Sequence, residues 1–80
     1  MTHVPHELHE EFPQAGEALH RLKVENAHFA RLADEYHAVN REIHRIESEV
    51  EAASDERTEQ LKRQRLALKD QIGEILRSAR

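Results

Sequence analysis

Residues 22–50 read LKVENAHFARLADEYHAVNREIHRIESEV, and this stretch decides the fold. Apolar or aromatic residues recur at every seventh position, at Leu22, Phe29, Tyr36, Ile43 and Val50. A second set falls between them at alternating steps of three and four, at Leu32, Val39 and Ile46. Such spacing places the side chains in one seam along a helix, and the seam must be buried against another helix.

A second helix is predicted directly after this stretch. Ser54 and Asp55 are preferred N-cap residues, and a second heptad pattern continues to Ser78. The intervening turn, 51–54, is short enough to force two helices to pack antiparallel. The sequence therefore predicts an all-α fold, an antiparallel two-helix coiled-coil hairpin. Residues 1–80 are predicted to form a single domain. It consists of an N-terminal arm (1–12), a long helix (13–50), the turn (51–54) and a C-terminal segment (55–80) that contains the second helix (55–78).

The two heptad patterns also predict a register. Folding the chain about residue 53 or 54 places Glu47 opposite Lys62 and Asn40 opposite Lys69. Residues 1–54 carry eleven acidic and five basic groups, whereas residues 55–80 carry five acidic and seven basic groups. Halves of opposite net charge favour this side-by-side arrangement. Gly73 is expected on the outer side of the second helix.

The N-terminal region leaves two points open. Val4, Leu8 and Phe12 are four residues apart, which predicts a short helix over 5–11 that Pro13 interrupts. Asn26 could cap a fresh helix, but the apolar pattern favours one helix that runs through it.

The second helix is too short to cover all of the first one, so residues 13–26 overhang it. Either the arm folds back over this overhang or a second chain covers it. Self-association, with a dimer favoured, is the expectation. The residues expected at that interface are Phe12, Leu19, Leu22 and Phe29.

Composition excludes several classes of protein. The 80 residues include no cysteine, so disulfides and thiolate metal sites are excluded, and an oligomer is a common way to stabilise so small a core. The net charge of −4 disfavours non-specific binding to nucleic acid. No apolar run reaches the length of about 18 residues that a membrane span needs. With no signal-peptide pattern at the N-terminus, the expected compartment is the cytoplasm.

Several short runs resemble a known family. They are Phe12-Pro13-Gln14, Ala27-His28-Phe29-Ala30-Arg31-Leu32, Glu42-Ile43-His44-Arg45-Ile46-Glu47, Leu61-Lys62-Arg63-Gln64-Arg65-Leu66 and Leu68-Lys69-Asp70-Gln71-Ile72. Over residues 8–77 the chain resembles the YdcH-like bacterial family of unknown function. The resemblance implies a small cytoplasmic helical hairpin without an established activity. Gly73 departs from the pattern, which implies an aromatic or larger residue there.

The histidines suggest a weak metal site. His3, His6 and His9 are three residues apart, and Glu10 follows His6 by four, so their side chains could converge on one helical turn. Without a thiolate, adventitious binding is the expectation, and no resident cofactor or metal is predicted.

The remaining polar patterns do not predict catalysis. The basic run around Lys62 and Arg63, with Lys69, could contact nucleic acid, but it lacks aromatic residues and has acidic neighbours. No nucleophile motif or phosphate loop is present. The leading hypothesis is a non-enzymatic protein–protein interaction or scaffold module with an unknown protein partner. A nucleic-acid-associated regulator and a weak histidine-based metal binder are the alternatives.

Overall fold

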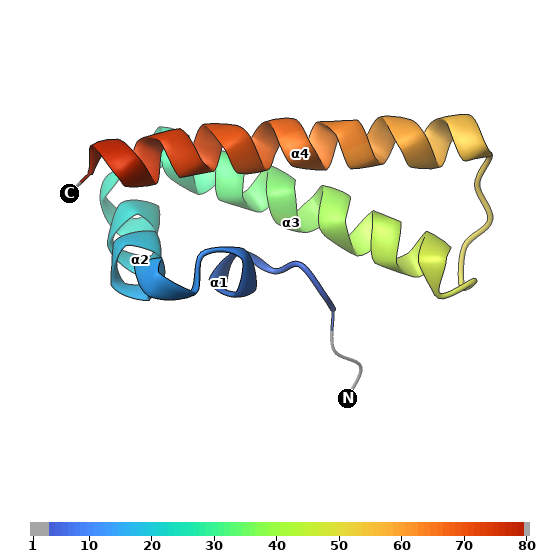
Figure 1. Cartoon of the computed structure of the whole chain (residues 1–80), viewed down its shortest axis with the longest axis horizontal. Helices are drawn as coiled ribbons and strands as arrows, with labels where there is room; N and C mark the ends of the chain where they lie inside the picture. Colours follow the sequence, from blue (N-terminus) through green and yellow to red (C-terminus); the bar gives the residue numbers. More distant parts are fainter. Residues whose placement is uncertain (1–3, 80) are drawn as a thin grey trace.

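A computed structural model describes residues 4–79, and within that range all regular structure is helical (Figure 1). The predicted all-α class is confirmed. The elements are α1 (Leu8–Glu11), the 3-10 helix η1 (Pro13–Ala15), α2 (Gly16–Glu25), α3 (Ala27–Glu47) and α4 (Asp55–Ser78).

The two long helices, α3 and α4, pack against each other, and the chain turns back between them through residues 48–54 (Figure 1). Their contact follows from the heptad pattern, because the seam residues of both helices are buried in one core. The α3 and α4 residues of that core are Phe29, Leu32, Ala33, Tyr36, Val39, Ile43, Leu61, Leu68 and Ile72.

The predicted continuous helix over 13–50 is wrong, because the chain breaks at Asn26. Asn26 is extended, and its side-chain Oδ1 accepts a hydrogen bond from the backbone N–H of Phe29 at 3.0 Å. This is the alternative in which Asn26 caps a fresh helix. The break lets α2 turn back and lie beside the long pair (Figure 1).

Residues 4–25, which we call the strap, include nearly all of the predicted overhang and fold back onto the α3–α4 pair. Leu8, Leu19 and Leu22 of the strap are all buried in the same core as the long helices. The predicted short helix is confined to Leu8–Glu11, because His6 has a positive φ of 64° that is incompatible with a right-handed helix. The apolar side chains of the predicted overhang are therefore buried within the chain, because α2 turns back together with the N-terminal arm.

The loop between α3 and α4 is longer than the predicted turn. α3 ends at Glu47 rather than at residue 50, and Val50, expected in the seam, is 76% exposed. Glu49 ends the helix with a positive φ of 64°, and the N–H of Val50 bonds back to the carbonyl of Arg45 at 3.0 Å. The start of α4 agrees with the prediction, since Ser54 Oγ accepts from the N–H of Arg57 at 3.1 Å.

The predicted register is met in part. Lys62 Nζ lies 3.3 Å from Glu47 Oε2, as expected from the charge pattern. Asn40, however, contacts Arg65 rather than Lys69, because Lys69 turns toward the strap and pairs with Glu11.

Gly73 is buried rather than on the outer side of α4. A Cβ built on Gly73 would lie 3.5 Å from Cε1 of Phe12, so the phenyl ring of the strap packs directly against this glycine. Phe12 of the strap thus packs at the position where the resemblance implies an aromatic or larger residue on α4.

Candidate functional site

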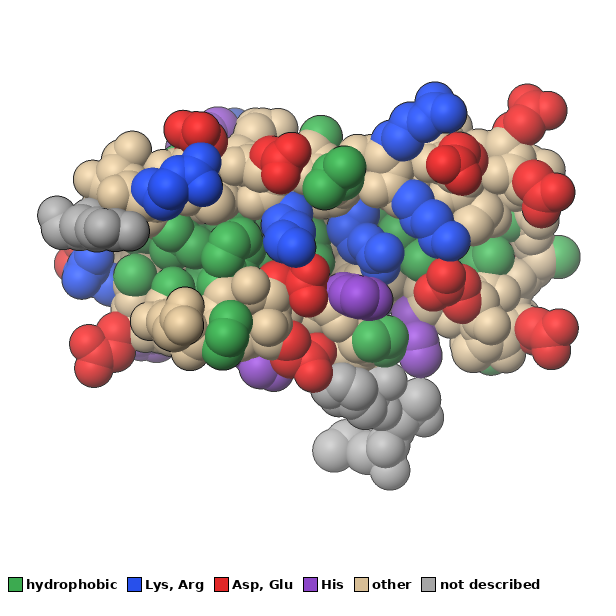
Figure 2. Space-filling model, viewed as in Figure 1, with side chains coloured by type: hydrophobic (Ala, Val, Ile, Leu, Met, Phe, Trp, Pro, Cys, Tyr) green, Lys and Arg blue, Asp and Glu red, His purple; other side chains and the backbone are tan. Residues whose placement is uncertain are grey.

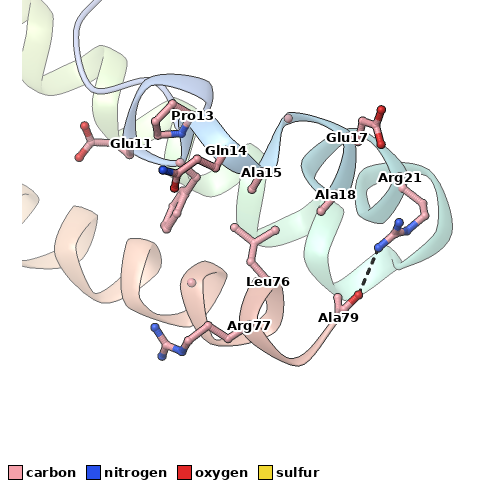
Figure 3. A pocket seen from close by; sticks show the side chains of 13 residues that line it. Glu11, Pro13, Gln14, Ala15, Glu17, Ala18, Arg21, Leu76, Arg77 and Ala79 are labelled. Atoms are coloured by element: carbon pink, nitrogen blue, oxygen red, sulfur yellow. Dashed lines mark hydrogen bonds between the residues drawn. The ribbon is translucent and has the colours of Figure 1, made fainter.

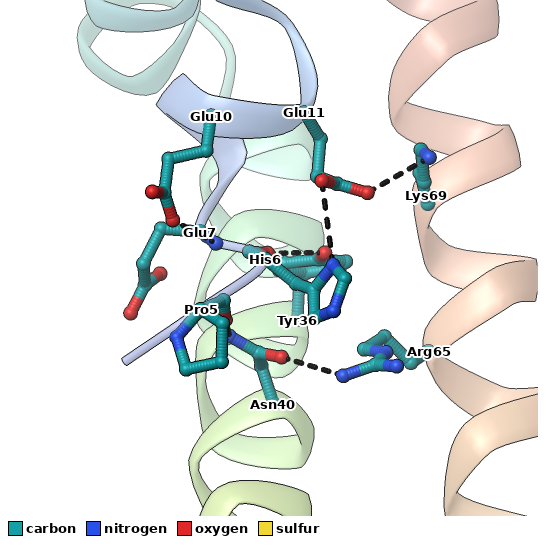
Figure 4. A network of polar contacts seen from close by, with 9 residues as sticks. All are labelled: Pro5, His6, Glu7, Glu10, Glu11, Tyr36, Asn40, Arg65 and Lys69. Carbon is teal, nitrogen blue, oxygen red and sulfur yellow. Dashed lines mark hydrogen bonds and ion pairs between the residues drawn. The ribbon is translucent and has the colours of Figure 1, made fainter. Parts of the chain in front are cut away.

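A buried amide joins the strap to both long helices. Asn40 on α3 is 1% exposed and is the buried polar residue of the described core. Its Nδ2 donates to the carbonyl of Pro5 at 2.8 Å, and its Oδ1 accepts from Nη1 of Arg65 on α4 at 2.9 Å (Figure 4). Because an unpaired buried amide is costly, this residue fixes the strap and α4 relative to α3.

The Tyr36 hydroxyl holds the strap one turn away. It donates to the carbonyl of His6 at 2.5 Å, while the ring is part of the core (Figure 4). Burial, followed by the charge of Glu11, raises the pKa of Tyr36 to about 12. The hydroxyl therefore stays protonated and acts as a donor across the ordinary pH range.

Three contacts between charged or titratable side chains add to the hydrogen bonds of Asn40 and Tyr36. We call all of these contacts together the latch. Lys69 Nζ lies 2.9 Å from Glu11 Oε1, and His6 Nδ1 lies 3.5 Å from the other oxygen of that carboxylate. The hydrogen bond from Lys69 lowers the pKa of Glu11, against the opposing effect of burial. Glu7 Oε2 lies 2.6 Å from Nδ1 of His37.

The Glu7 contact needs a proton. Glu7 Oε2 is buried and has no other hydrogen-bond partner in the described residues, so the contact is satisfied only when a proton lies between Oε2 and Nδ1 of His37. Apart from the His6–Glu11 contact, which lies within the strap, the latch joins backbone carbonyls and carboxylates of the strap to side chains of α3 and α4. The latch therefore positions the strap, and its hydrogen-bond donors and acceptors are occupied by these contacts.

A groove opens at the end of the molecule where the strap meets the last turns of α4. Its volume is about 780 Å³, and η1, the start of α2 and the C-terminal end of α4 form its walls (Figure 3). Hydrophobic side chains line the hollow between α4 and the strap (Figure 2). The apolar lining residues include Phe12, Ala15, Ala18, Leu76 and Ala79.

The rim of this terminal groove carries charges of both signs. Glu17 and Arg21 come from α2, and Arg77 comes from α4. Arg21 also crosses the groove end, since its Nη2 donates to the carbonyl of Ala79 at 3.3 Å (Figure 3). An apolar floor with a mixed polar rim is typical of a surface that receives a side chain of a protein partner.

Comparison with known proteins assigns a family. A family model described as "Protein of unknown function (DUF465)" matches residues 29–76. The chain belongs to this family. YdcH is a member too, so the assignment is consistent with the resemblance noted in the sequence. No curated protein and no solved structure matches the chain.

The family match coincides with one part of the molecule. Residues 29–76 begin in the first turn of α3 and end in the last turns of α4, so they are the α3–α4 pair and its loop. The strap precedes the matched region. The latch and the terminal groove both lie where the strap meets the matched helices.

The residues predicted at an oligomer interface are placed inside the single chain. Leu19, Leu22 and Phe29 are 5%, 9% and 0% exposed, and Phe12 is half-buried against Gly73. These side chains are buried because the helix breaks at Asn26 and does not run straight through it. Self-association remains a prediction, but it cannot use these side chains while the strap is folded back.

Of the weak metal-ligand candidates, the three that the structure describes, His6, His9 and Glu10, are not brought together as a metal site. His3 lies outside the described residues. His6 faces Glu11, and Glu10 Oε1 accepts from the N–H of Glu7 at 3.3 Å, while His9 is exposed. Within residues 4–79, no group of three or more histidine, aspartate or glutamate side chains is placed to hold a metal ion.

The basic face of α4 is largely occupied by contacts within the chain. Figure 2 shows lysine and arginine side chains along α4 with acidic side chains between them. Lys62 pairs with Glu47 and Lys69 pairs with Glu11, whereas Arg63 lies exposed near acidic residues of the first α4 turns. These pairings leave less positive charge for phosphate groups than the sequence alone suggests. None of the helices in residues 4–79 has the length and apolar character to cross a membrane.

Sequence reasoning missed the latch and the groove. Asn40 and Arg65 carry a signal, since both are polar residues beside a heptad seam. The strap acceptors, however, are the backbone carbonyls of Pro5, bound by Asn40, and of His6, bound by Tyr36, and a backbone acceptor has no signature in the sequence. The groove was missed because it forms only when α2 turns back at Asn26.

Proposed function

We propose that this chain is a non-enzymatic protein–protein interaction module that receives a side chain of its partner in the terminal groove. The observation that carries the proposal is the groove itself, an apolar hollow between Phe12 on the strap and Leu76 on α4. An antiparallel α3–α4 hairpin would be its scaffold, and the Glu47–Lys62 ion pair supports that register. The cytoplasmic location expected from the sequence stays a prediction.

The form of the groove suggests the chemistry of a partner. Its floor offers aromatic and aliphatic surface, and its rim offers Glu17 beside Arg21 and Arg77. A peptide or helix that inserts one apolar anchor and places charged residues around it fits these features. Conversion of a small molecule is less well supported, because the polar side chains of the latch are engaged in holding the strap.

Gly16 offers a way to block the groove without disturbing the fold. It lines the groove at the start of α2, its backbone is right-handed helical, and a Cβ at this position would meet no atom within 4 Å. Gly16→Trp should therefore place an indole over the hollow, whereas Gly16→Ala adds a single methyl group and serves as the matched control.

The experiment is affinity capture from the native cell with three baits: wild type, Gly16→Ala and Gly16→Trp. Circular dichroism first establishes that all three baits have the same helix content. We expect a partner that is retained by wild type and Gly16→Ala and lost with Gly16→Trp. Recovery of the same partners with all three baits would contradict a role for the terminal groove.

A further inference from the structure

A single residue separates α2 from α3. Asn26 is extended, with φ −129° and ψ 104°, yet its N–H still donates to the carbonyl of Leu22 at 2.9 Å. Its own carbonyl accepts from the N–H of Ala30 at 2.9 Å. Helical hydrogen bonding thus stops and resumes at the same residue. The side-chain cap on Phe29 is what holds the break locally.

The sequence on both sides of the break fits an uninterrupted helix. Leu22 and Phe29 are seven residues apart and continue one heptad seam, and neither proline nor glycine lies between them. If Asn26 became helical, the N–H groups of residues 27–29 would donate to the carbonyls of residues 23–25. One helix could then run from residue 16 to residue 47, about 48 Å at about 1.5 Å per residue.

What keeps the strap folded back is therefore its contact with the α3–α4 pair. Leu8, Leu19 and Leu22 fill the core, and Asn40 and Tyr36 bind strap carbonyls. A straightened hinge would carry the strap away from its own pair and expose those apolar side chains. The surface that matches the strap residue by residue is the α3–α4 pair of another copy.

We propose that Asn26 is a hinge for strap exchange, through which two copies of this chain form a dimer with each strap latched onto the α3–α4 pair of the other. Exchange of identical elements is a low-cost route to dimers, because every contact of the monomer is remade across the two chains. This inference goes beyond the proposed function and names a second partner, another copy. In such a dimer each terminal groove joins Phe12 of one chain to Leu76 of the other.

Substitution at the hinge tests the energetic part of the proposal. Asn26→Ala removes the cap and favours a continuous helix, whereas Asn26→Gly also removes the side chain but disfavours the helix. Alanine favours the helical state over glycine by about fivefold at one position, and two hinges straighten in each dimer. Sedimentation velocity over a concentration series should therefore show that the Asn26→Ala dimer dissociates at concentrations at least about tenfold lower than the Asn26→Gly dimer.

Chemical crosslinking tests whether the strap is exchanged. Glu7 and His37 lie in contact across the latch, and the chain has no native cysteine. Chains carrying Glu7→Cys and chains carrying His37→Cys, each with Asn26→Ala, are unfolded together, refolded and treated with a short bis-maleimide linker. Strap exchange predicts a crosslink between the two different chains. One chain with both cysteines and the native Asn26 is the positive control and should link internally.

The outcomes separate the alternatives. A dimer of Asn26→Ala with the crosslink between chains supports exchange. A monomer at every concentration overturns it, and so does a dimer in which the positive control links but the mixed chains do not. Either negative result leaves the groove proposal standing, because the capture experiment with the Gly16 variants does not depend on a dimer.

Discussion

The α3–α4 pair and the strap share one hydrophobic core, but different kinds of contact hold them. The pair consists of helices of 21 and 24 residues, whose buried residues run from Phe29 to Ile43 on α3 and from Leu61 to Gly73 on α4. The strap consists of helices of 4, 3 and 10 residues, too short to be stable alone, and side chains of the pair hold its backbone carbonyls. The pair should therefore persist when the strap opens, whereas the strap cannot persist without the pair.

The largest expected effect comes from truncating a core side chain of each region. Ile72→Ala on α4 removes a side chain with 0% exposure and should lower the free energy of unfolding by about 2–5 kcal/mol. Leu8→Ala on the strap, with 2% exposure, should cost less in global unfolding and mainly raise the rate of proteolysis within residues 4–25. Urea unfolding followed by circular dichroism, with limited proteolysis, measures both. Equal losses of global stability in the two variants would contradict the expectation that the strap opens separately from the pair.

Removal of the buried amide should have the next largest effect. Asn40→Ala leaves the Pro5 carbonyl and the Arg65 guanidinium without their partner, at a cost of about 1–3 kcal/mol. Asn40→Asp is the matched variant, because it keeps an acceptor for Arg65 and loses the donor to Pro5. We expect both variants to increase amide exchange in the strap. Unchanged exchange there in Asn40→Ala would show that the latch does not hold the strap.

The sequence predicted the pair well and the strap poorly, for a physical reason. Heptad spacing and the Ser54 cap are local signals, and they placed α4 at the residues where it lies. Whether Asn26 breaks a helix depends on the free energy gained when Leu19 and Leu22 pack back onto the pair. That gain comes from contacts between distant residues, so the choice between capping and continuity stayed open in the sequence.

Acid should weaken the strap before it weakens the pair. The pKa of Glu11 is lowered in the folded chain, first by the hydrogen bond from Lys69 and also by His6. The carboxylate therefore stabilises the closed strap above its ordinary pKa of 4.5, and this contribution is lost as the pH falls through the lowered value. Proteolysis within the strap, or hydrogen exchange of its backbone amides, should rise on acidification in wild type. The rise with falling pH should be smaller in Glu11→Gln. Glu59→Gln on the exposed face of α4 is the control and should leave it unchanged.

The smallest effect is expected in the loop of the pair. Glu49 has a left-handed backbone with φ 64°, a conformation that glycine adopts without steric cost. Glu49→Gly should raise the free energy of global unfolding by up to about 1 kcal/mol. Thermal unfolding measures this gain. Hydrogen exchange of strap amides, relative to that of amides in the α3–α4 pair, serves as the internal comparison. A loss of stability would mean that the Glu49 side chain makes a contact that outweighs the backbone strain.

We expect the strap to open as a unit while the α3–α4 pair stays folded. Native-state hydrogen exchange of the wild-type chain, resolved by residue, tests it most directly. We predict that amides of α2 exchange with a common opening free energy clearly below that of amides around Tyr36, Ile43 and Leu68. If amides of α2 and of the centre of the pair exchange with the same free energy, equal to that of global unfolding, the strap does not open separately from the pair.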